Sequence, residues 1–288
     1  MTMELIGFDI DARGVTGVVI DGNGGVLRRA RSEGEWSAAL KAVFAELGRK
    51  PYEACGVAAE VDVGEMAFER GVAPRFLHTS TPGAAAVAAE AWVGAARQAR
   101  HAVCLWIGDR VLAGVLLNGQ PWLGAHGRAG AAGWLALNPV ERQDYRKYGS
   151  FAAEVSDRGI ARRLAWRIQA GDHSAVLERA GDLDAITAAH VFEGARTGDG
   201  VAISVVRDTA RYVGMATANL IAVFDPEVIV LGGPIAGAGD LLLDPARQEC
   251  ARRLPPAVSD LVRFDVSPLG GDGIAIGAAS LALVARDS

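Results

Sequence analysis

The opening of the chain contains three short apolar runs, and this feature constrains the fold more than any other. The runs cover residues 4–10, 15–21 and 26–31 and are separated by residues typical of turns. The segment DGNGG, which ends the second run, is a strong signal for a hairpin turn between paired strands. We therefore predict that the chain begins with three strands joined by tight turns.

Helical and extended patterns alternate after this opening. Trp36, Leu40, Val43 and Leu47 recur at helical spacing, and Gly48 is a plausible stop. Further short strands are predicted at 54–61 and 74–79, a helix at 82–97, and a second pair of strands at 102–108 and 111–119 with a turn at 109–110. The strand pair at 102–119 repeats the pattern of paired strands with which the chain opens.

The rest of the chain is irregular from 120 to 150 and then mostly helical. Apolar residues between 200 and 224 recur at four- and three-residue spacing, as on a packed helix face. A strand, a Gly-rich turn and a helix occupy 226–254, and a strand at 260–268 precedes a closing helix at 271–286. This order predicts two α/β halves. With the closing helix returning to the first half, we expect a small domain from residues 1–118 and 273–288 and a larger one from 119–272.

Size and charge exclude several classes of protein. The chain has 288 residues, a net charge of -5 and a pI near 5.6, so it lacks a globally basic surface for nucleic acid. It contains no apolar run long enough for a membrane span and no signal-peptide pattern. Cys55, Cys104 and Cys250 lie far apart, which predicts three reduced, buried thiols in a cytoplasmic protein.

Several segments together resemble the ROK family of sugar kinases and related repressors. The most specific is NLIAVFDPEVIVLGG at 219–233, and the others are LIGFDIDARGVTGVVIDGNGGVL, AAAVAAEAWVGAAR, GVLLNGQPWLGAHGRAGAAGW and GDGIAIGAASLAL. The resemblance covers nearly the whole chain. It implies a two-domain actin-like ATPase (ribonuclease H-like) fold with an interdomain cleft, assembled as a homodimer or a larger homo-oligomer.

Sugar phosphorylation requires a carboxylate that accepts the proton of the attacking hydroxyl. In the family this base is the Asp of an Asn-Asp-Ala-Asn motif at the start of the interdomain helix. Ungapped alignment from Glu90 puts TPGA there, so Pro82 occupies the position of the base. Thr81 or Ser80 is then expected to cap the helix, with Pro82 in the first turn, where its missing N–H costs little.

The two glycine-rich turns that hold phosphates in the family are also altered. The first reads DIDARG instead of Asp-Ile-Gly-Gly-Thr-Lys and keeps Asp9, which helps to organise the metal in the family. The second reads GDRVLAG from residue 108 instead of Gly-Thr-Gly-Ile-Gly-Gly-Gly. Side chains and negative charge thus enter both turns. We predict that Asp11 or Asp109 pairs with Arg110 or Arg13 and partly fills the phosphate position; alternatively, the arginines bind an anion.

The sugar-binding positions have lost their polar groups. The family motif Ala-Gly-Glu-Ile-Gly-His reads AGAAGW here, so Ala131 replaces the Glu and Trp134 replaces the His that binds sugar and, in many members, a structural zinc. Ala84 stands at a further sugar-ligand position. The Cys-rich zinc loop of the family is replaced by NPVERQDYRKYGS. We therefore predict no structural zinc and no metal site.

Residual ligand contacts and a displaced base are both open alternatives. Asp9, Gly232 and Gly233 are the candidates for nucleotide or metal contacts, so Mg-ATP remains a candidate cofactor. Asp62, Glu65 and His78 lie near enough in sequence to supply a displaced base, whereas His126 and His173 are isolated and read as ordinary polar residues.

The sequence therefore favours a ROK-family sugar-kinase homologue that is inactive or strongly impaired. Such a protein would keep the scaffold for a small-molecule ligand in the cleft, for oligomerisation or for regulation. One alternative is an active hexose or amino-sugar kinase with a rearranged site. The other is a transcriptional regulator that lacks its own DNA-binding domain, because the first strand begins by Glu4 and leaves no room for a helix-turn-helix.

Overall fold

A computed structural model describes residues 3–48, 50–60 and 74–287 and confirms the predicted α/β class. It contains two five-stranded sheets. The contacts divide the chain into two compact units, the first within Met1–Cys104, Ala113–Gly130 and Ser267–Ser288, and the second within Leu105–Leu112 and Ala131–Val266. The domain boundaries given above stay a prediction.

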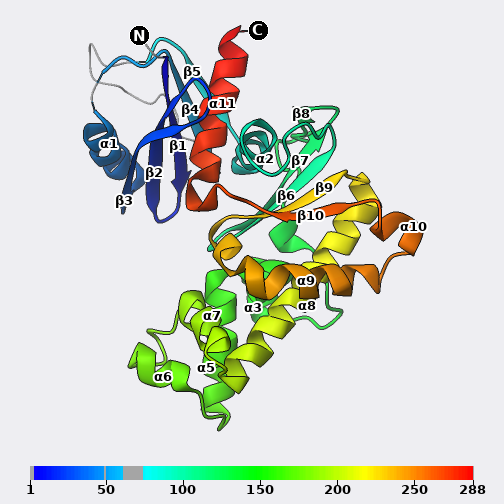
Figure 1. Cartoon of the computed structure of the whole chain (residues 1–288). Coiled ribbons are helices and arrows are strands. Elements are labelled where there is room, and N and C mark those ends of the chain that lie inside the picture. The colour runs from blue at the N-terminus through cyan, green and yellow to red at the C-terminus, as the bar shows by residue number, and fades with distance from the viewer. Residues whose placement is uncertain (1–2, 49, 61–73, 288) are drawn as a thin grey trace. The chain divides into compact units, whose positions relative to one another are not determined.

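The first sheet has the strand order β3-β2-β1-β4-β5 (Figure 1). Its strands are β1 (Glu4–Asp11), β2 (Gly14–Asp21), β3 (Val26–Glu33), β4 (Ala54–Ala59) and β5 (Leu77–Ser80). β1 pairs antiparallel with β2, and β2 with β3, which confirms the predicted opening meander. β4 is parallel to both β1 and β5.

Helices cover both faces of this sheet, because apolar residues alternate along its strands. One face packs Ile6, Phe8 and Val19 against helix α1 (Trp36–Leu47). The other packs Leu5, Val18 and Ile20 against α2 (Pro82–Trp92) and α11 (Gly273–Asp287). Glycines allow α11 to approach closely: a Cβ on Gly56 would lie 1.8 Å from the carbonyl oxygen of Ala278.

The second sheet has the order β10-β9-β6-β7-β8. Its strands are β6 (Ala102–Ile107), β7 (Val111–Leu117), β8 (Gln120–Pro121), β9 (Val228–Gly232) and β10 (Arg263–Val266). The helices of this part of the chain are α3 (Gln143–Tyr148), α4 (Ser150–Val155), α5 (Asp157–Gln169), α6 (Ala175–Ala180), α7 (Ala188–Arg196), α8 (Gly200–Phe224), α9 (Gly239–Ala251) and α10 (Pro256–Ser259), with 3-10 turns η1 (Ala132–Trp134) and η2 (Pro234–Ala238). A third 3-10 turn, η3 (Gly270–Asp272), precedes α11 in the first unit.

Helix α2 ends at Trp92, so the prediction that it continues to Arg97 was wrong. The reason is that the side chain of Glu90 replaces a backbone carbonyl as the hydrogen-bond acceptor of a backbone amide. The amide of Ala95 donates to the carboxylate of Glu90 at 2.9 Å, where a continuing helix would use a carbonyl. Gly94 is needed beside that carboxylate, because a Cβ there would lie 2.1 Å from a Glu90 oxygen.

Two further expectations concern burial and membranes. Cys55, Cys104 and Cys250 are all buried and free, as predicted. Burial raises the pKa of the Cys55 and Cys104 thiols, which keeps them protonated. None of the described helices combines the length and the apolar character that a membrane crossing requires.

Candidate functional site

The entrance to α2 is closed by its own cap. Thr81 is the N-cap, and its hydroxyl oxygen accepts a hydrogen bond from the amide of Ala84 at 3.2 Å. Pro82 follows in the first turn, where no N–H partner is needed. Both Pro82 and Ala84 are buried, and the first turn contains no acidic residue. The predicted cap is confirmed as Thr81, while Ser80 is the last residue of β5.

Asp9 lies at the same end of the first sheet as this entrance. Asp9 is paired in register with Ala58 of β4, and Ala58 with Ser80 of β5. The three parallel strands therefore bring Asp9, the turn after β1 and the start of α2 to the carboxyl edge of the sheet, where α/β proteins bind ligands. Asp9 is 6% exposed, so a carboxyl group is held almost out of solvent there.

The turn after β1 is closed by a carboxylate of the chain itself. One oxygen of Asp11 accepts hydrogen bonds from the amides of Arg13 at 2.7 Å and Gly14 at 3.1 Å. Backbone amides of such turns are the groups that bind anions. In this turn they are engaged by an internal anion. The ion pairing of Asp11 or Asp109 with Arg13 or Arg110 stays a prediction.

Backbone fills the space beside the start of α2. A Cβ on Gly83 would lie 2.8 Å from the carbonyl oxygen of Ala113, and one on Gly130 would lie 1.8 Å from the same atom. The amide of Ala113 donates to the carbonyl of Gly130 at 2.7 Å. A Cβ on Gly114 would lie 2.1 Å from the carbonyl oxygen of Gly83. Gly83, Gly114 and Gly130 are therefore required for the close packing of α2, β7 and the backbone at residue 130.

The second unit carries Ala131 and Trp134 on the η1 turn. The side chain of Trp134 is 61% exposed, although its backbone is tightly held. A Cβ on Gly149 would lie 2.2 Å from the carbonyl oxygen of Gly133, and one on Gly133 would lie 3.1 Å from the Cβ of Ala152. This segment presents an indole ring and a methyl group, and the indole N–H is its one polar side-chain group.

The same unit also contains the predicted nucleotide-contact glycines. Gly232 ends β9, and Gly233 has a φ of 83°. A Cβ on Gly233 would lie 2.9 Å from the ring of Trp106. The carbonyl of Gly108, in the turn after β6, accepts a hydrogen bond from the amide of Asp157 at the start of α5 at 3.0 Å. Packing thus accounts for Gly233, and its contact with a nucleotide stays a prediction.

Of the three candidates for a displaced base, the structure describes only His78. His78 lies on β5, and burial lowers its pKa, which favours the neutral imidazole. Asp62 and Glu65 lie outside the described residues. His126 and His173 are exposed. In the part of the chain that the structure describes, no group of three or more His, Cys, Asp or Glu is arranged to hold a metal ion.

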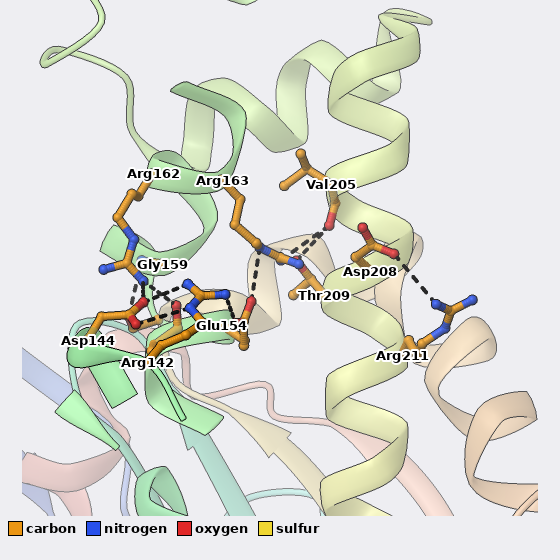
Figure 2. Close-up of polar contacts among 12 residues, drawn as sticks. Arg142, Asp144, Glu154, Gly159, Arg162, Arg163, Val205, Asp208, Thr209 and Arg211 are labelled. Atoms are coloured by element: carbon orange, nitrogen blue, oxygen red, sulfur yellow. Dashed lines mark hydrogen bonds and ion pairs between the residues drawn. The ribbon is translucent and has the colours of Figure 1, made fainter. Parts of the chain in front are cut away.

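A group of charged residues that the sequence did not single out lies around α4, the helix that packs beside η1. Figure 2 shows the members of this group. Arg142, Arg162 and Arg163 face Asp144 and Glu154, and the two carboxylates are 15% and 3% exposed. The five residues come from the loop before α3 and from α3, α4 and α5. In the sequence, each of these residues looks like an ordinary surface charge of its own segment. The one sequence feature that marked the region was the absence of Cys from NPVERQDYRKYGS.

Comparison with known proteins places the chain among sugar kinases and their relatives. The sequence profile of the ROK family matches residues 76–285. Glucokinase from Halalkalibacterium halodurans is 33% identical over 190 residues, 65% of this chain and 58% of that protein. Glucokinase from Thermotoga maritima is 30% identical over 196 residues, 68% of this chain and 62% of that protein. The chain thus spans about three fifths of the length of these relatives.

Solved structures extend the likeness to nearly the whole chain. A ROK family glucokinase from Streptomyces griseus in complex with glucose and AMPPNP superposes with a TM-score of 0.82 at 24% identity, covering 99% of this chain and all of that one. A ROK hexokinase from Thermus thermophilus gives 0.73 at 23% identity, with coverage of 99% and 100%. The predicted actin-like fold is therefore confirmed. The DNA-binding transcriptional dual regulator NagC of Escherichia coli is 28% identical over 163 residues, 56% of this chain and 39% of that protein.

Proposed function

The chain belongs to the ROK family, and we propose that it is a sugar-kinase-like protein that has lost sugar phosphorylation or retains it only weakly. The scaffold would serve to bind a small molecule in the predicted cleft. We place it in the cytoplasm as a homodimer or larger homo-oligomer, without direct binding to DNA.

The observation that carries this proposal is the capped entrance of α2 at Thr81 and Pro82. A general base must lie within hydrogen-bond reach of the hydroxyl proton that it removes. The residue at the family position of that base has no proton acceptor on its side chain, and Thr81 already uses its oxygen for the amide of Ala84. Loss of one general base typically lowers a rate about 10²–10⁴-fold.

The turn after β1 supports the same proposal. The carboxylate of Asp11 engages the amides of Arg13 and Gly14, and it would repel the negatively charged oxygens of a nucleotide. Restoring a base at residue 82 would leave this obstacle in place. Phosphoryl transfer depends mainly on positioning and charge stabilisation of the phosphates, so the altered turn weakens the reaction independently.

The positions inherited from the sugar site favour a different class of ligand. Ala84 and Ala131 have no polar group, and Trp134 offers an exposed aromatic face. A site that recognises a sugar hydroxyl by hydrogen bonds has lost that recognition when these groups are removed. We therefore propose a ligand with a flat or apolar face in place of a sugar that is held through several hydroxyls.

One observation favours the alternative of an active kinase. Asp9, the carboxylate that relatives use near the metal, is retained and almost buried. Its presence is compatible with Mg-ATP as a cofactor and with a base supplied by a residue other than Pro82. This second candidate predicts turnover that depends on both magnesium and a sugar.

Formation of sugar phosphate and ADP with Mg-ATP and a panel of hexoses and amino sugars tests the proposal. The wild type and Pro82→Asp are compared, because a carboxylate is favourable in the first turn of a helix. Since residue 82 is buried, urea unfolding of Pro82→Asp checks that the variant is folded. We expect neither protein to produce ADP above its control without sugar. Sugar-dependent product from the wild type at the rates usual for kinases, about 1–100 s⁻¹, would contradict the proposal. Product at such rates from Pro82→Asp alone would show that the base is the only missing part.

A further inference from the structure

The charged group around α4 forms one connected network around Arg142 (Figure 2). The guanidinium of Arg142 donates two hydrogen bonds to Asp144, from Nε at 3.1 Å and from Nη2 at 2.7 Å. Its remaining nitrogen, Nη1, donates to Glu154 at 3.1 Å. The hydroxyl of Tyr145 donates to the same Glu154 oxygen. One arginine thus links the loop before α3 to a buried carboxylate of α4.

Two arginines of α5 extend the network in opposite directions. Arg162 donates to Asp144 at 2.8 Å and to the carbonyl of Ala153 at 2.8 Å. Arg163 lies 3.8 Å from Glu154 and donates to Val205 and Thr209 of α8. Figure 2 shows Arg163 reaching across to α8, so the network ties α3, α4 and α5 to this helix of 25 residues.

Burial makes this network sensitive to the loss of any charged member. The side chain of Glu154 is 3% exposed, and a buried carboxylate is tolerated only when it is paired and hydrogen-bonded. Two carboxylates face three guanidinium groups. Neutralising Glu154 would therefore leave excess positive charge close to Arg163, whose side chain is 12% exposed.

Helix α4, which carries Glu154 of the network, packs against the η1 turn. Gly149 joins α3 to α4 at a φ of 89°, and its Cα lies so close to η1 that a Cβ would be 3.1 Å from the amide nitrogen of Trp134. Gly133 is packed against Ala152 of α4 in the same way. Any shift of α3 or α4 relative to α5 is consequently passed to the backbone that carries Ala131 and Trp134.

A zinc ion, which the family resemblance implies near this segment, does not fit the residues present. Zinc sites use Cys, His and carboxylate ligands in tetrahedral sets. The segment 131–149 contains neither Cys nor His. The carboxylates of Asp144 and Glu154 are already hydrogen-bonded to guanidinium groups. Within the described residues there is also no metal-ligating group of three or more.

We infer that Arg142 and Glu154 are positioning residues of an ionic clip that holds segment 131–149, and with it Trp134, where relatives use a metal. The inference is independent of the proposed function, since it requires only that this segment be held in place. The clip joins helices without metal and depends on charge and on the two-pronged geometry of arginine.

Hydrogen exchange of the full-length protein, followed by peptide, tests this inference together with thermal unfolding in EDTA. EDTA should change neither the melting temperature nor exchange within 131–149. Glu154→Gln and Arg142→Lys should each raise exchange in that segment by about tenfold or more while distant segments stay unchanged. Glu141→Gln is the matched control, because Glu141 pairs with Arg146 on the exposed side of the same region, where both side chains are 75% exposed.

Two results would overturn the inference. The first is a lower melting temperature or faster exchange of 131–149 in EDTA, which would reveal a metal clip. The second is unchanged exchange of 131–149 in Glu154→Gln. If Glu154→Gln does not fold, Asp144→Asn removes a less buried carboxylate of the same network. Unchanged exchange of 131–149 in Asp144→Asn would then overturn the inference in the same way.

Discussion

The carboxylate of Asp11 accepts a hydrogen bond from the amide of Arg13 at 2.7 Å, so the turn between β1 and β2 is closed by its own side chain. Asp21 closes the next turn in the same manner, accepting from the amides of Asn23 at 2.8 Å and Gly25 at 2.9 Å. The two turns lie at opposite ends of β2. The chain therefore provides a matched pair of carboxylates, of which only Asp11 lies at the edge that carries the entrance to α2.

Replacing Asp11 by Gly should expose the amides of the first turn to a phosphate. We expect Asp11→Gly to bind Mg-ADP at least about tenfold more tightly than the wild type in calorimetry. Asp11→Asn should bind Mg-ADP with an affinity between those of the wild type and Asp11→Gly, because the Asn oxygen can still accept from the amides while the negative charge that repels phosphate is gone. Asp21→Gly is the control and should not change binding. Equal gains for Asp11→Gly and Asp21→Gly would show that the effect is not local to the first turn.

Removing the hydroxyl of Thr81 should destabilise the start of α2. Thr81→Ala is expected to lower the free energy of unfolding by about 1 kcal/mol, the usual cost of losing an N-cap. Ser80→Ala should have a smaller effect, because the hydroxyl of Ser80 makes only a long contact of 3.4 Å with the carbonyl of Val57. Urea denaturation of both variants measures the difference, and a larger loss for Ser80→Ala would contradict the assignment of the cap.

Much of the fold and of this helix entrance follows from local sequence. Turn residues predict the opening meander, and Ser-Thr-Pro predicts the cap, because both depend on a few neighbouring residues. The closing of the first turn by Asp11 also had a signal, since an Asp followed three residues later by Gly favours this kind of turn. The end of α2 at Trp92 could not be predicted in this way. Apolar residues continue past Trp92 at helical spacing, and the helix ends because the carboxylate of Glu90 accepts a hydrogen bond from the amide of Ala95.

The ionic network could not be predicted because its members meet only in three dimensions. Arg142 and Glu154 are twelve positions apart and belong to different elements. Arg163 and Thr209 are 46 positions apart. Sequence spacing identifies residues that share one helix face, but it does not show which faces meet. For the same reason the sequence could report the loss of zinc ligands and could not show the arginine network present there.

Close packing beside α2 makes Gly130 less tolerant of substitution than its neighbour Gly127. Both have a positive φ, 79° and 65°, so a change to Ala costs about 1–2 kcal/mol in backbone strain at either position. At Gly130 the new Cβ would also meet the carbonyl oxygen of Ala113 at 1.8 Å, whereas nothing lies within 4 Å at Gly127. Thermal unfolding should show a clearly greater loss for Gly130→Ala. Equal losses would contradict the packing described.

Buried Glu90 should make stability depend on pH. Burial raises the pKa of its carboxyl group, although Ser267 and the amide of Ala95 donate to it. The native state then holds this proton more tightly than the unfolded chain, so the contribution to stability is lost as pH rises above the ordinary range of Glu. The stability of Glu90→Gln relative to the wild type should therefore increase between about pH 5 and about pH 8.

The control for that titration is Glu46→Gln, which changes an exposed Glu on α1. Its stability relative to the wild type, measured over the same range, gives the effect of removing a carboxylate that is not buried. Cys104 also interacts with Glu90. Burial and this carboxylate raise the pKa of the Cys104 thiol, so it remains protonated throughout. A relative stability of Glu90→Gln that falls with rising pH would show that the carboxylate is stabilised, and not strained, in the native state.

Single-turnover transfer of labelled γ-phosphate from Mg-ATP to sugar is the most direct test of the central claim. The wild-type protein is held in excess over ATP, so that even very slow transfer is seen, with glucose and amino sugars offered separately. We predict that label appears in sugar no faster than in the control without protein. Transfer at the rates usual for kinases, about 1–100 s⁻¹, would contradict the claim that Pro82 and the closed Asp11 turn have removed sugar phosphorylation.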